Sequence, residues 1–374
     1  SMTKKIGIAR AHTNIALIKY WGKRDKELFL PMNSSLSLTL DAFYTDTKVV
    51  FDSELTGDEF YLNGNVQNEK EILKISRFLD LFREYIGEGN FARVESLNFV
   101  PTAAGLASSA SAFAALALAT ATALHLDLSP AQLSTFARRG SGSSTRSLFG
   151  GFVEWDMGTG SEDSMARPID DADWDIAMIV LAVNTGPKKI ASREGMDHTV
   201  ATSPFYSAWV ETAQSDLADI KVAIANRDFE KLGQITEHNG MKMHATTLSA
   251  NPPFTYWTAD SLLAQEAVRQ VREKTGLSAY MTMDAGPNVK VLCRESEMDE
   301  FVNGLSQIFP REKIITSKPG PAAYILSEEE WHASQKKFEK SLEHECSDQG
   351  SRKIIFGWRI CGGGVRKPSS DSSS

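Results

Sequence analysis

Five short segments of this 374-residue chain carry the residue types that bind or transfer phosphate groups. The first is residues 101–114 (PTAAGLASSASAFA), a run of small side chains leading into an alanine-rich stretch, 107–124, that is predicted to be helical. Gly105 allows a tight turn there, and the free N–H groups at a helix N-terminus bind phosphate well. The same pattern is typical of a small-residue packing helix with a serine cap, so this segment alone leaves both interpretations open.

The second segment, 11–23 (AHTNIALIKYWGK), is apolar apart from a few polar groups and two lysines. The partly alternating pattern of 6–21 predicts a strand. Side chains alternate along a strand, so Lys19, Trp21 and Lys23 would share one face. Two ammonium groups on one face repel each other unless an anion or acid lies between them. The segment therefore predicts an anion site or, alternatively, a solvated edge strand, where lysine is common.

The third, fourth and fifth segments concentrate hydroxyls, cations and one carboxylate. Residues 138–146 (RRGSGSSTR) lie between a predicted helix and a predicted buried strand, an unusual place for a flexible Gly/Ser linker, and Arg binds carboxylate or phosphate through a two-pronged contact. In 283–289 (MDAGPNV), Asp284 lies at the end of a predicted strand, a position that fits either a turn cap or a general base or orienting carboxylate. Residues 188–193 (KKIASR) add cations and one hydroxyl, or form a solvated basic face.

The bulk composition narrows the class of protein. The net charge of −8 argues against general nucleic-acid binding, which favours basic surfaces. Cys293, Cys346 and Cys361 form no Cys-x-x-Cys pair, which suits a reducing compartment and no structural zinc. The sequence has no run of apolar residues long enough to span a membrane and no signal-peptide pattern. It also lacks the P-loop, dinucleotide-binding, zinc-protease and serine-hydrolase motifs. We expect a cytoplasmic protein.

The elements that must position these segments alternate between strand and helix, with a tight turn at 63–65. The expected strands are 6–21, 35–40, 45–51 (after a turn), 91–100, a strand beginning at 150, 174–183, 279–283 and 289–292. The expected helices are 68–85, 107–124, 130–139, 205–226, 229–244, 260–274 and 298–309. A lobe boundary is predicted near 185–187. From about Trp331 the composition becomes rich in Lys, Glu, Ser and Gly, and 368–374 is expected to be disordered.

These segments together resemble the mevalonate diphosphate decarboxylases of the GHMP kinase superfamily. The matching runs are 14–23, 31–40 (PMNSSLSLTL), 101–111, 140–155, and 254–256 with 283–290. The run PTAAGLASSA is close to diagnostic for this branch of the superfamily. The similarity extends roughly to residue 325.

The resemblance implies an α+β fold of the GHMP kinase type, with two mixed α/β lobes, antiparallel-rich sheets and the active site in the cleft between the lobes. The expected division is an N-terminal lobe with the phosphate-binding loop (1–185), a C-terminal lobe (186–327) and a partly disordered C-terminal extension (328–374). The resemblance also implies a homodimer, with no nucleic-acid or membrane partner.

The implied reaction uses ATP and Mg²⁺. ATP phosphorylates the 3-hydroxyl of mevalonate 5-diphosphate, and the new phosphate and CO2 then leave to give isopentenyl diphosphate, a step of isoprenoid biosynthesis. Two alternatives remain: a mevalonate or phosphomevalonate kinase without decarboxylation, and a silent member that only senses its ligand. The joint presence of Asp284, Lys19 and Arg146 argues against the kinase. The retention of Asp284 and Lys19 argues against the sensor.

Residue roles follow from the same resemblance. Asp284 matches the catalytic aspartate, as base or as electrostatic stabiliser. Lys19 matches the lysine near the transferred phosphoryl group, where it would also keep Asp284 ionised. Arg146, together with Asn14, matches the groups that orient the substrate carboxylate. Thr145 stands where relatives usually carry Cys or Ser, a tolerable difference.

Two further sets match the binding positions for phosphates. The substrate diphosphate would be held by Tyr20, Lys23, Ser141, Ser143, Ser192 and Arg193. The ATP phosphates would be cradled by Gly105, Leu106, Ala107, Ser108, Ser109 and Ala110. Ser109 would lie nearest the metal.

Overall fold

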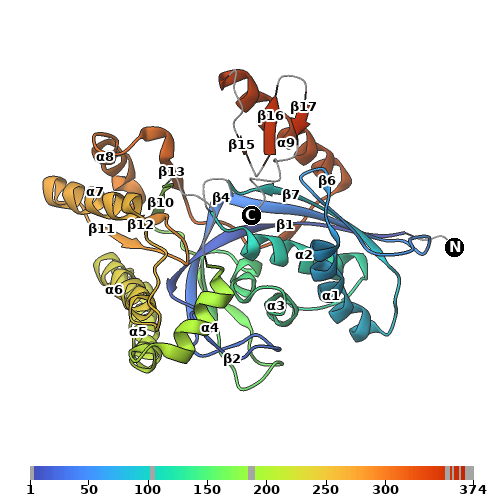
Figure 1. The fold of residues 1–374 in the computed structure, drawn as a ribbon, viewed down its shortest axis with the longest axis horizontal. Helices are drawn as coiled ribbons and strands as arrows, with labels where there is room; N and C mark the ends of the chain where they lie inside the picture. The colour runs from blue at the N-terminus through green and yellow to red at the C-terminus, as the bar shows by residue number, and fades with distance from the viewer. Residues whose placement is uncertain are drawn as a thin grey trace.

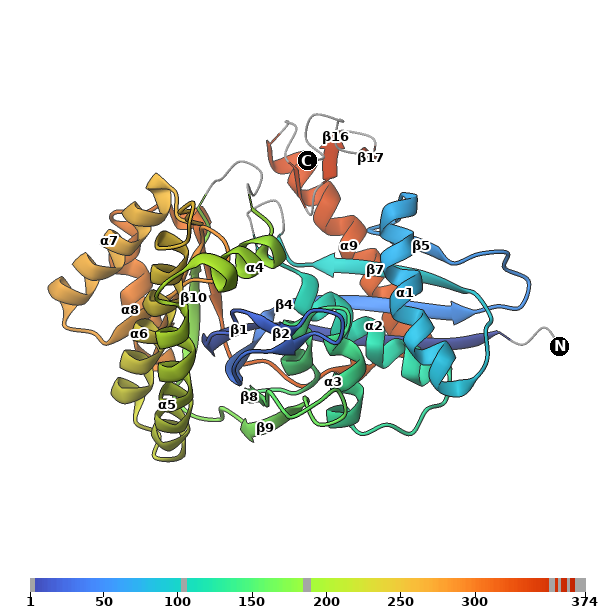
Figure 2. The same ribbon diagram turned by 60° about the horizontal axis from the view of Figure 1, so that its bottom comes forward.

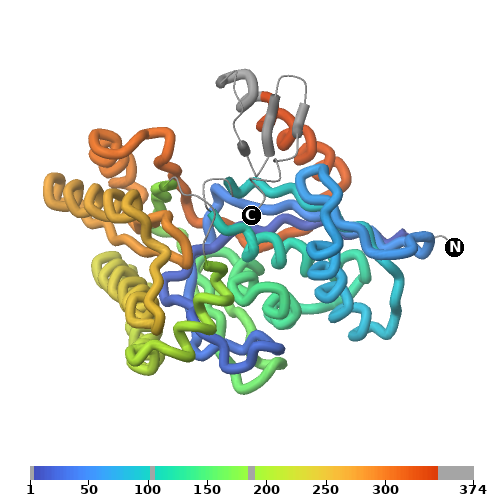
Figure 3. Tube along the Cα trace, viewed as in Figure 1, coloured from blue at the N-terminus to red at the C-terminus, as the bar shows by residue number. Residues whose placement is uncertain are grey.

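The computed structural model describes residues 4–101, 106–183 and 190–349, with three short strands beyond them, β15 (Ile354–Ile355), β16 (Trp358–Cys361) and β17 (Gly364–Arg366). Side chains are described up to residue 343. Two sheets dominate the molecule and lie in two lobes (Figure 1). In the Cα trace, the blue-to-green residues form most of one lobe and the yellow-to-orange residues most of the other (Figure 3).

The first lobe is built on an eight-stranded sheet with the order β14-β1-β4-β7-β5-β6, to which β8 and β9 are joined through β4. All its pairings are antiparallel except that of β5 with β7. The strands are β1 (Lys5–Ile18), β4 (Ser35–Phe51), β5 (Glu59–Leu62), β6 (Asn65–Val66), β7 (Ala92–Phe99), β8 (Phe152–Trp155), β9 (Ala166–Asp170) and β14 (Tyr324–Ile325). A separate short hairpin joins β2 (Lys23–Asp25) and β3 (Leu30–Pro31).

The strand β4 corrects the expectation of two strands around a turn. It is continuous over 17 residues and pairs with β1 on both sides of an irregularity. His12 lies opposite Tyr44 and Asn14 opposite Thr39, so four residues of β4 face one residue of β1. Asp41 lies in this bulge, which bends the strand without ending it.

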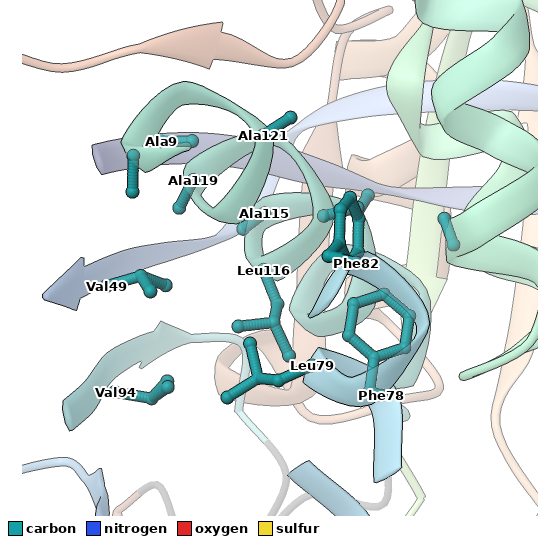
Figure 4. Close-up of a cluster of buried hydrophobic side chains, with 14 of the residues drawn as sticks. Ala9, Val49, Phe78, Leu79, Phe82, Val94, Ala115, Leu116, Ala119 and Ala121 are labelled. Atoms are coloured by element: carbon teal, nitrogen blue, oxygen red, sulfur yellow. The ribbon is translucent and has the colours of Figure 1, made fainter. Parts of the chain in front are cut away.

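The two faces of this sheet are covered by different helices. One face packs against α1 (Glu69–Ile86), α2 (Ser109–Ala123) and α3 (Pro130–Arg138), with Val49, Val94, Phe78 and Leu79 in the core between them (Figure 4). The alanines of α2 let it approach β1 so closely that a side chain at Gly7 would meet the carbonyl oxygen of Ala119 at 1.9 Å. The packing interpretation of the alanine-rich stretch is therefore correct for the body of this helix.

The opposite face of the sheet is covered by α9 (Glu328–Gln349). Trp331, Phe338 and Leu342 of this helix are buried against Tyr44 and Phe99 of the sheet, among other apolar side chains. Figure 2 shows α9 on the far side of the strands from α2 and α3. The first part of the predicted extension is thus a packed helix, whereas 367–374 lies outside the described residues.

The second lobe holds a four-stranded antiparallel sheet of order β11-β12-β10-β13. On β10, Ala177 and Ile179 face α7 and α8, while Met178 and Val180 face α5 and α6, as the alternation of side chains requires. The strands are β10 (Ala177–Leu181), β11 (Ala279–Thr282), β12 (Val289–Cys293) and β13 (Ile314–Ser317). The helices are α4 (Ser192–Thr202), α5 (Tyr206–Ala225), α6 (Phe229–Leu248), α7 (Ala259–Thr275) and α8 (Glu295–Ser306).

The lobes share a continuous apolar core. Leu17 and Leu38 of the first sheet and Leu292 of the second belong to the same cluster as Ile220 and Leu232 of α5 and α6. The chain also returns to the first lobe, because β14 pairs with β1 although its residues lie in the range predicted for the second lobe. The predicted boundary residues, 185–187, lie outside the described residues. Within the described residues, no helix is both long and apolar enough to cross a bilayer.

Candidate active site

An ion pair between the lobes lies at the centre of the site. The Nζ of Lys19, just after the end of β1, donates to Oδ1 of Asp284 at 2.9 Å and to the carbonyl oxygen of Ala16 at 2.6 Å. Lys19 is almost fully buried, with 3% of its side chain exposed, whereas Asp284 keeps 40% exposed. The lysine is therefore fixed inside the protein, and the carboxylate remains reachable by a substrate.

Two asparagines fix the backbone of Lys19. Its N–H donates to Oδ1 of Asn239 on α6 at 2.9 Å, and its carbonyl oxygen accepts from Nδ2 of Asn33 at 2.9 Å. Asn239 in turn donates to Asp216, which also accepts from Lys242. Both peptide groups beside Lys19 are thus held by side chains, because β1 has already ended and no neighbouring strand satisfies them.

The expectation that Lys19, Trp21 and Lys23 share one strand face is wrong. The strand β1 ends at Ile18, and the chain turns at Gly22, whose φ is +117°. A β-carbon at Gly22 would lie 1.8 Å from the hydroxyl of Tyr206. The turn sends the two lysines to different places: Lys19 contacts Asp284, while Lys23 lies on β2 near an aromatic ring.

The loop that carries Asp284 is anchored on several sides. Nε2 of the buried His244, on α6, bonds with the carbonyl oxygen of Met283 at 2.8 Å. Burial, the largest effect, lowers the pKa of His244 to about 4, so its ring is neutral at physiological pH and Nε2 carries the proton it donates. The hydroxyl of Ser261 donates to the carbonyl oxygen of Pro287 at 2.7 Å. The loop joins β11 to β12, and these anchors fix Asp284 relative to α6, which also fixes Lys19.

A second lysine contacts the aspartate. Lys290, buried in β12, places Nζ 3.5 Å from Oδ2 of Asp284. Lys290 lies within the run 283–290 that matched the family, but no role was predicted for it. Its signal was available, because a lone lysine inside the buried strand VKVLC requires an anionic partner.

The charges around Asp284 set its ionisation. Burial alone would raise the pKa of this carboxyl group, but the positive charges of Lys19, Lys290 and Arg146 together outweigh burial and hold the pKa well below its usual range. Asp284 is therefore ionised and weakly basic before any ligand binds. Three cations around one anion leave this part of the site with an excess of positive charge.

Arg146 and Asn14 form a second buried group. Arg146 donates from Nε to Oδ1 of Asn14 at 3.3 Å and from Nη1 to the hydroxyl of Ser35. Asn14 donates to the hydroxyl of Ser147 at 2.7 Å and to the carbonyl oxygen of Ser143. Burial lowers the pKa of Arg146 only to about 10, so it stays charged at neutral pH. Neither of these hydrogen-bond partners of Arg146 is acidic, which leaves guanidinium donors for an anionic ligand.

A short 3₁₀ helix (Gly142–Leu148) carries the predicted serines and Arg146. The hydroxyls of Ser141 and Ser143 lie 3.1 Å apart, and that of Ser141 donates to the hydroxyl of Ser109 at 3.4 Å. Gly142 allows this arrangement, because a β-carbon there would meet the rings of Trp155 and Tyr20. The fold therefore brings the predicted ATP segment and the predicted substrate segment into contact.

The predicted ATP segment forms the N-terminus of α2. Gly105 lies outside the described residues, Leu106 is buried, and Ala107 and Ser109 are exposed. Ser108 is the N-cap residue, but its side chain makes no capping hydrogen bond, so the first N–H groups of the helix are not capped by it. Ser111, three residues on, is instead buried and bonds with Thr45 and the carbonyl oxygen of Ser108.

The remaining predicted substrate residues lie around a cationic cluster. Lys23 on β2 and Arg193 near the N-terminus of α4 lie beside each other, and Ser192 is the first residue of α4. Burial, then the charge of Arg193, lowers the pKa of Lys23 to about 8. Tyr20 packs edge-on against Trp155 at 4.6 Å. Lys188 and Lys189 lie outside the described residues.

One cation in the predicted donor segment is structural. Arg138 is fully buried and donates to the carbonyl oxygens of Leu28, Ser161 and Ser164. It ties the β2–β3 hairpin to the loop before β9 and has no contact with the ion pair. Thr145 is also buried, with its hydroxyl bonded to the carbonyl oxygen of Gly142.

The described residues contain no group of three His, Cys, Asp or Glu side chains that could hold a metal ion. A site without such a group can still bind Mg²⁺, because this ion keeps several waters and is usually bound through phosphates with one or two protein ligands. The exposed hydroxyl of Ser109, at the α2 N-terminus and beside Ser141, is suited to be such a ligand.

The two-sheet architecture is the GHMP kinase fold. Residues 11–166 match the model of the diphosphomevalonate decarboxylase-like N-terminal domain, and residues 178–360 match that of the mevalonate 5-diphosphate decarboxylase C-terminal domain. The chain belongs to the mevalonate diphosphate decarboxylase family.

Individual relatives agree with this assignment. A diphosphomevalonate decarboxylase of Ganoderma lucidum is 38% identical over 81% of this chain and 82% of its own. The crystal structure of mevalonate diphosphate decarboxylase from Staphylococcus aureus is 47% identical, with a TM-score of 0.84, over 87% of this chain and 99% of that one. A structure of "MDDEF in complex with MVAPP, AMPPCP and Magnesium" is 51% identical, with a TM-score of 0.83, over 87% of this chain and 100% of that one.

Proposed function

We propose that this protein is an ATP-dependent diphosphomevalonate decarboxylase that converts mevalonate 5-diphosphate into isopentenyl diphosphate. The observation that carries the proposal is the pairing of Asp284 with Lys19 and Lys290. Close to it lies the guanidinium group of Arg146, whose hydrogen-bond partners described above are not acidic. Asp284 with its two lysines is the group that phosphoryl transfer needs, so a kinase would also have it. Arg146 is suited to bind a substrate carboxylate, and decarboxylation requires such a carboxylate. A structure similar to this chain is described as binding MVAPP with an ATP analogue and magnesium, which supports these substrates and this ion.

The first step is transfer of the γ-phosphoryl group. The tertiary hydroxyl oxygen bonds to phosphorus while the bond to the β-phosphate oxygen breaks, and ADP leaves. Asp284 is a weak base in its cationic surroundings, so it accepts the hydroxyl proton only once the new P–O bond has made that proton acidic. Its earlier contribution is to orient the hydroxyl, while Lys19 balances charge on the transferred group. Magnesium, when bound, neutralises the phosphate charge as the phosphoryl group moves.

The second step forms the double bond. The C–O bond to the new phosphate breaks, and phosphate takes the electron pair. The bond between the carboxylate carbon and the neighbouring carbon then supplies the electrons of the new C=C bond as CO2 departs. Asp284 passes its proton to an oxygen of the departing phosphate, and the restored negative charge of the carboxylate stabilises the electron-poor carbon between these events. Arg146, held by Asn14 and Ser35, orients the carboxylate. A strong clamp would oppose its loss, so Arg146 acts mainly in positioning.

The binding roles extend this proposal. Tyr20, Lys23, Ser141, Ser143, Ser192 and Arg193 hold the substrate diphosphate, and the segment 105–110 cradles the ATP phosphates. The predicted division into lobes 1–185 and 186–327 with the extension 328–374 is kept only in outline, because β10 (Ala177–Leu181) lies in the second sheet and β14 (Tyr324–Ile325) in the first. We further propose a cytoplasmic homodimer.

The decisive experiment follows both products. The protein is incubated with ATP, Mg²⁺ and mevalonate 5-diphosphate, and CO2 and ADP are measured. Equal release of the two is expected. ADP without CO2 would identify a kinase, and release of neither would identify a protein that only binds its ligand. Omission of mevalonate 5-diphosphate is the control for background ATP hydrolysis.

A further inference from the structure

Phe29 lies in contact with both cations of the proposed diphosphate site. The ring is in the loop between β2 and β3, with Nζ of Lys23 4.7 Å from its centroid and Cζ of Arg193 4.9 Å from it. Lys23 belongs to the first lobe and Arg193 to α4 of the second. One aromatic side chain therefore connects the cations of two distant segments, both within the range of a cation–π interaction.

The backbone of Phe29 is held in a conformation that side chains rarely adopt. Its φ is +55°, in the left-handed region, which is a genuine outlier for a bulky residue. Strain of this kind is unfavourable and persists where the surroundings enforce it, often at ligand sites. The ring is only half-buried, and it is not among the residues of the described apolar cores. Burial of the ring does not account for the strain.

The charged groups around the ring indicate what its position does. Besides Arg193, the charged groups that affect Lys23 are Asp197 and Lys26. Asp197 forms an ion pair with Lys26 at 3.6 Å and so is shared with another cation. Lys23 and Arg193 repel each other, and the negative face of an aromatic ring offsets part of that repulsion without occupying the place of an anionic ligand.

We propose that Phe29 is a positioning residue that holds Lys23 and Arg193 side by side as a two-point anchor for the diphosphate. An acidic residue in its place would neutralise the cations and compete with the ligand. The ring keeps them together and leaves both charges free for phosphate oxygens. This inference rests on the proposed function, because it assumes that these cations bind the diphosphate.

The test compares three variants by calorimetric titration with inorganic pyrophosphate. Phe29→Leu keeps the β-carbon and the strained φ but removes the ring, whereas Phe29→Tyr keeps the ring face. Phe205→Leu is the matched control, because Phe205 is 60% exposed at the start of α5. Phe29→Leu is expected to weaken binding about 5- to 10-fold, the loss of one or two cation–π contacts. The tyrosine variant and the control should bind like the wild type.

A second readout separates positioning from a packing defect. The ring favours the charged form of Lys23, so its removal should lower the pKa of that ammonium group. The KM for mevalonate 5-diphosphate should then rise at a lower pH in Phe29→Leu than in the wild type, with kcat nearly unchanged. A packing defect would change KM equally at every pH.

The outcomes distinguish this inference from the proposed function. Undiminished pyrophosphate binding by Phe29→Leu, or weakening as large in Phe29→Tyr, overturns the role of Phe29 and leaves the reaction standing. Failure of the wild type to bind pyrophosphate overturns the assignment of the two cations, and the inference with it. Absence of CO2 release by the wild type overturns the reaction itself, whatever the titration gives.

Discussion

The two charged regions of the site are built in opposite ways. Around Asp284, the lysines Lys19 and Lys290 contact the same carboxylate, and side chains hold the backbone on both sides of Lys19. Around Phe29, the cations Lys23 and Arg193 lie next to each other and contact a ring in place of an acid. The first region contains its own counter-ion, and under the proposed function the second region would take its counter-ion from the substrate diphosphate.

This difference teaches how one site handles two anionic ends of a substrate. Groups near a reacting atom must already be aligned, because alignment during the reaction adds to the barrier. Groups that only bind an anion gain more if their charges are left unpaired, because no internal ion pair must be broken first. We therefore expect substitutions in the first region to change kcat and those in the second to change KM.

The largest effect is expected for Asp284→Ala. Turnover should fall about 10³-fold or more, because both the orientation of the hydroxyl and the fixed negative charge are lost, while substrate binding changes far less. The measurement is kcat for CO2 release together with a substrate titration. Turnover within tenfold of the wild type would refute the assigned role.

Arg146→Lys should come next, with a loss of about 10²-fold in kcat/KM. Lysine keeps the charge but cannot reproduce the two-pronged contact or the bonds to Asn14 and Ser35. The ratio of CO2 to ADP is the informative measurement. If the carboxylate is misplaced, some phosphorylated intermediate should escape, and ADP should exceed CO2. A ratio of one with normal turnover would exclude a role in orientation.

In the second region, the pH dependence of KM should follow Lys23. Its pKa of about 8 means that the ammonium group is mostly charged below pH 8 and loses its proton above it. Only the charged form attracts the diphosphate, so KM should rise about eightfold between pH 7.5 and pH 9. Lys23→Arg is the control, because a guanidinium stays protonated throughout. A wild-type KM that is flat over this range would contradict the assignment.

A smaller effect is expected where a residue acts only on the position of Lys19. Asn239→Leu leaves the backbone N–H of Lys19 without its acceptor, and we expect kcat to fall about fivefold, in line with the loss of roughly one hydrogen bond, with KM unchanged. Thr236→Val, on the same helix and equally buried, is the control for stability. Equal losses of kcat in the two variants would indicate a general weakening of α6.

The smallest effect on activity should come from α9, which lies outside both regions. Phe338→Ala should lower the free energy of unfolding by about 3–5 kcal/mol, because it empties a buried contact with the sheet. Thermal unfolding measures this loss, and kcat below the unfolding temperature should remain that of the wild type. A selective loss of kcat would connect α9 to the site.

The sequence was most informative about residues assigned to the reacting groups. It was least informative about residues that hold the backbone of another residue in place. Resemblance identified Lys19, Asp284, Arg146 and Asn14, and the fold brings all four together. Asn239 and His244 were missed, because their partners lie 220 and 39 residues away and an asparagine or histidine inside a helix has no distinctive local pattern. Phe29 was missed for a similar reason, since its φ is set by tertiary contacts.

The errors about strands have a common physical origin. Periodicity reports which face a side chain takes, but it does not report where a strand ends or bends. The sequence pattern predicted Lys19 and Lys23 on one strand, but the turn at Gly22 separates them. A turn was expected between the strands 35–40 and 45–51, but the intervening residues lie within β4, where 40–43 form a bulge against β1. The helix at Pro130–Arg138 was predictable because its start is encoded locally by a Ser-Pro cap.

The pairing of β14 with β1 has a consequence for how the chain folds. Arg10 bonds with Tyr324 across 314 positions, and Ser334 of α9 bonds with Asp46 across 288. Among the described residues, the apolar cluster of Tyr44 and Phe99 is completed by Leu326 and by the α9 side chains, which are made long after β1, β4 and β7. Contacts of such high sequence separation slow folding. During synthesis, this apolar face of the first lobe therefore stays exposed until α9 has been made. A chaperone would bind the chain during that interval.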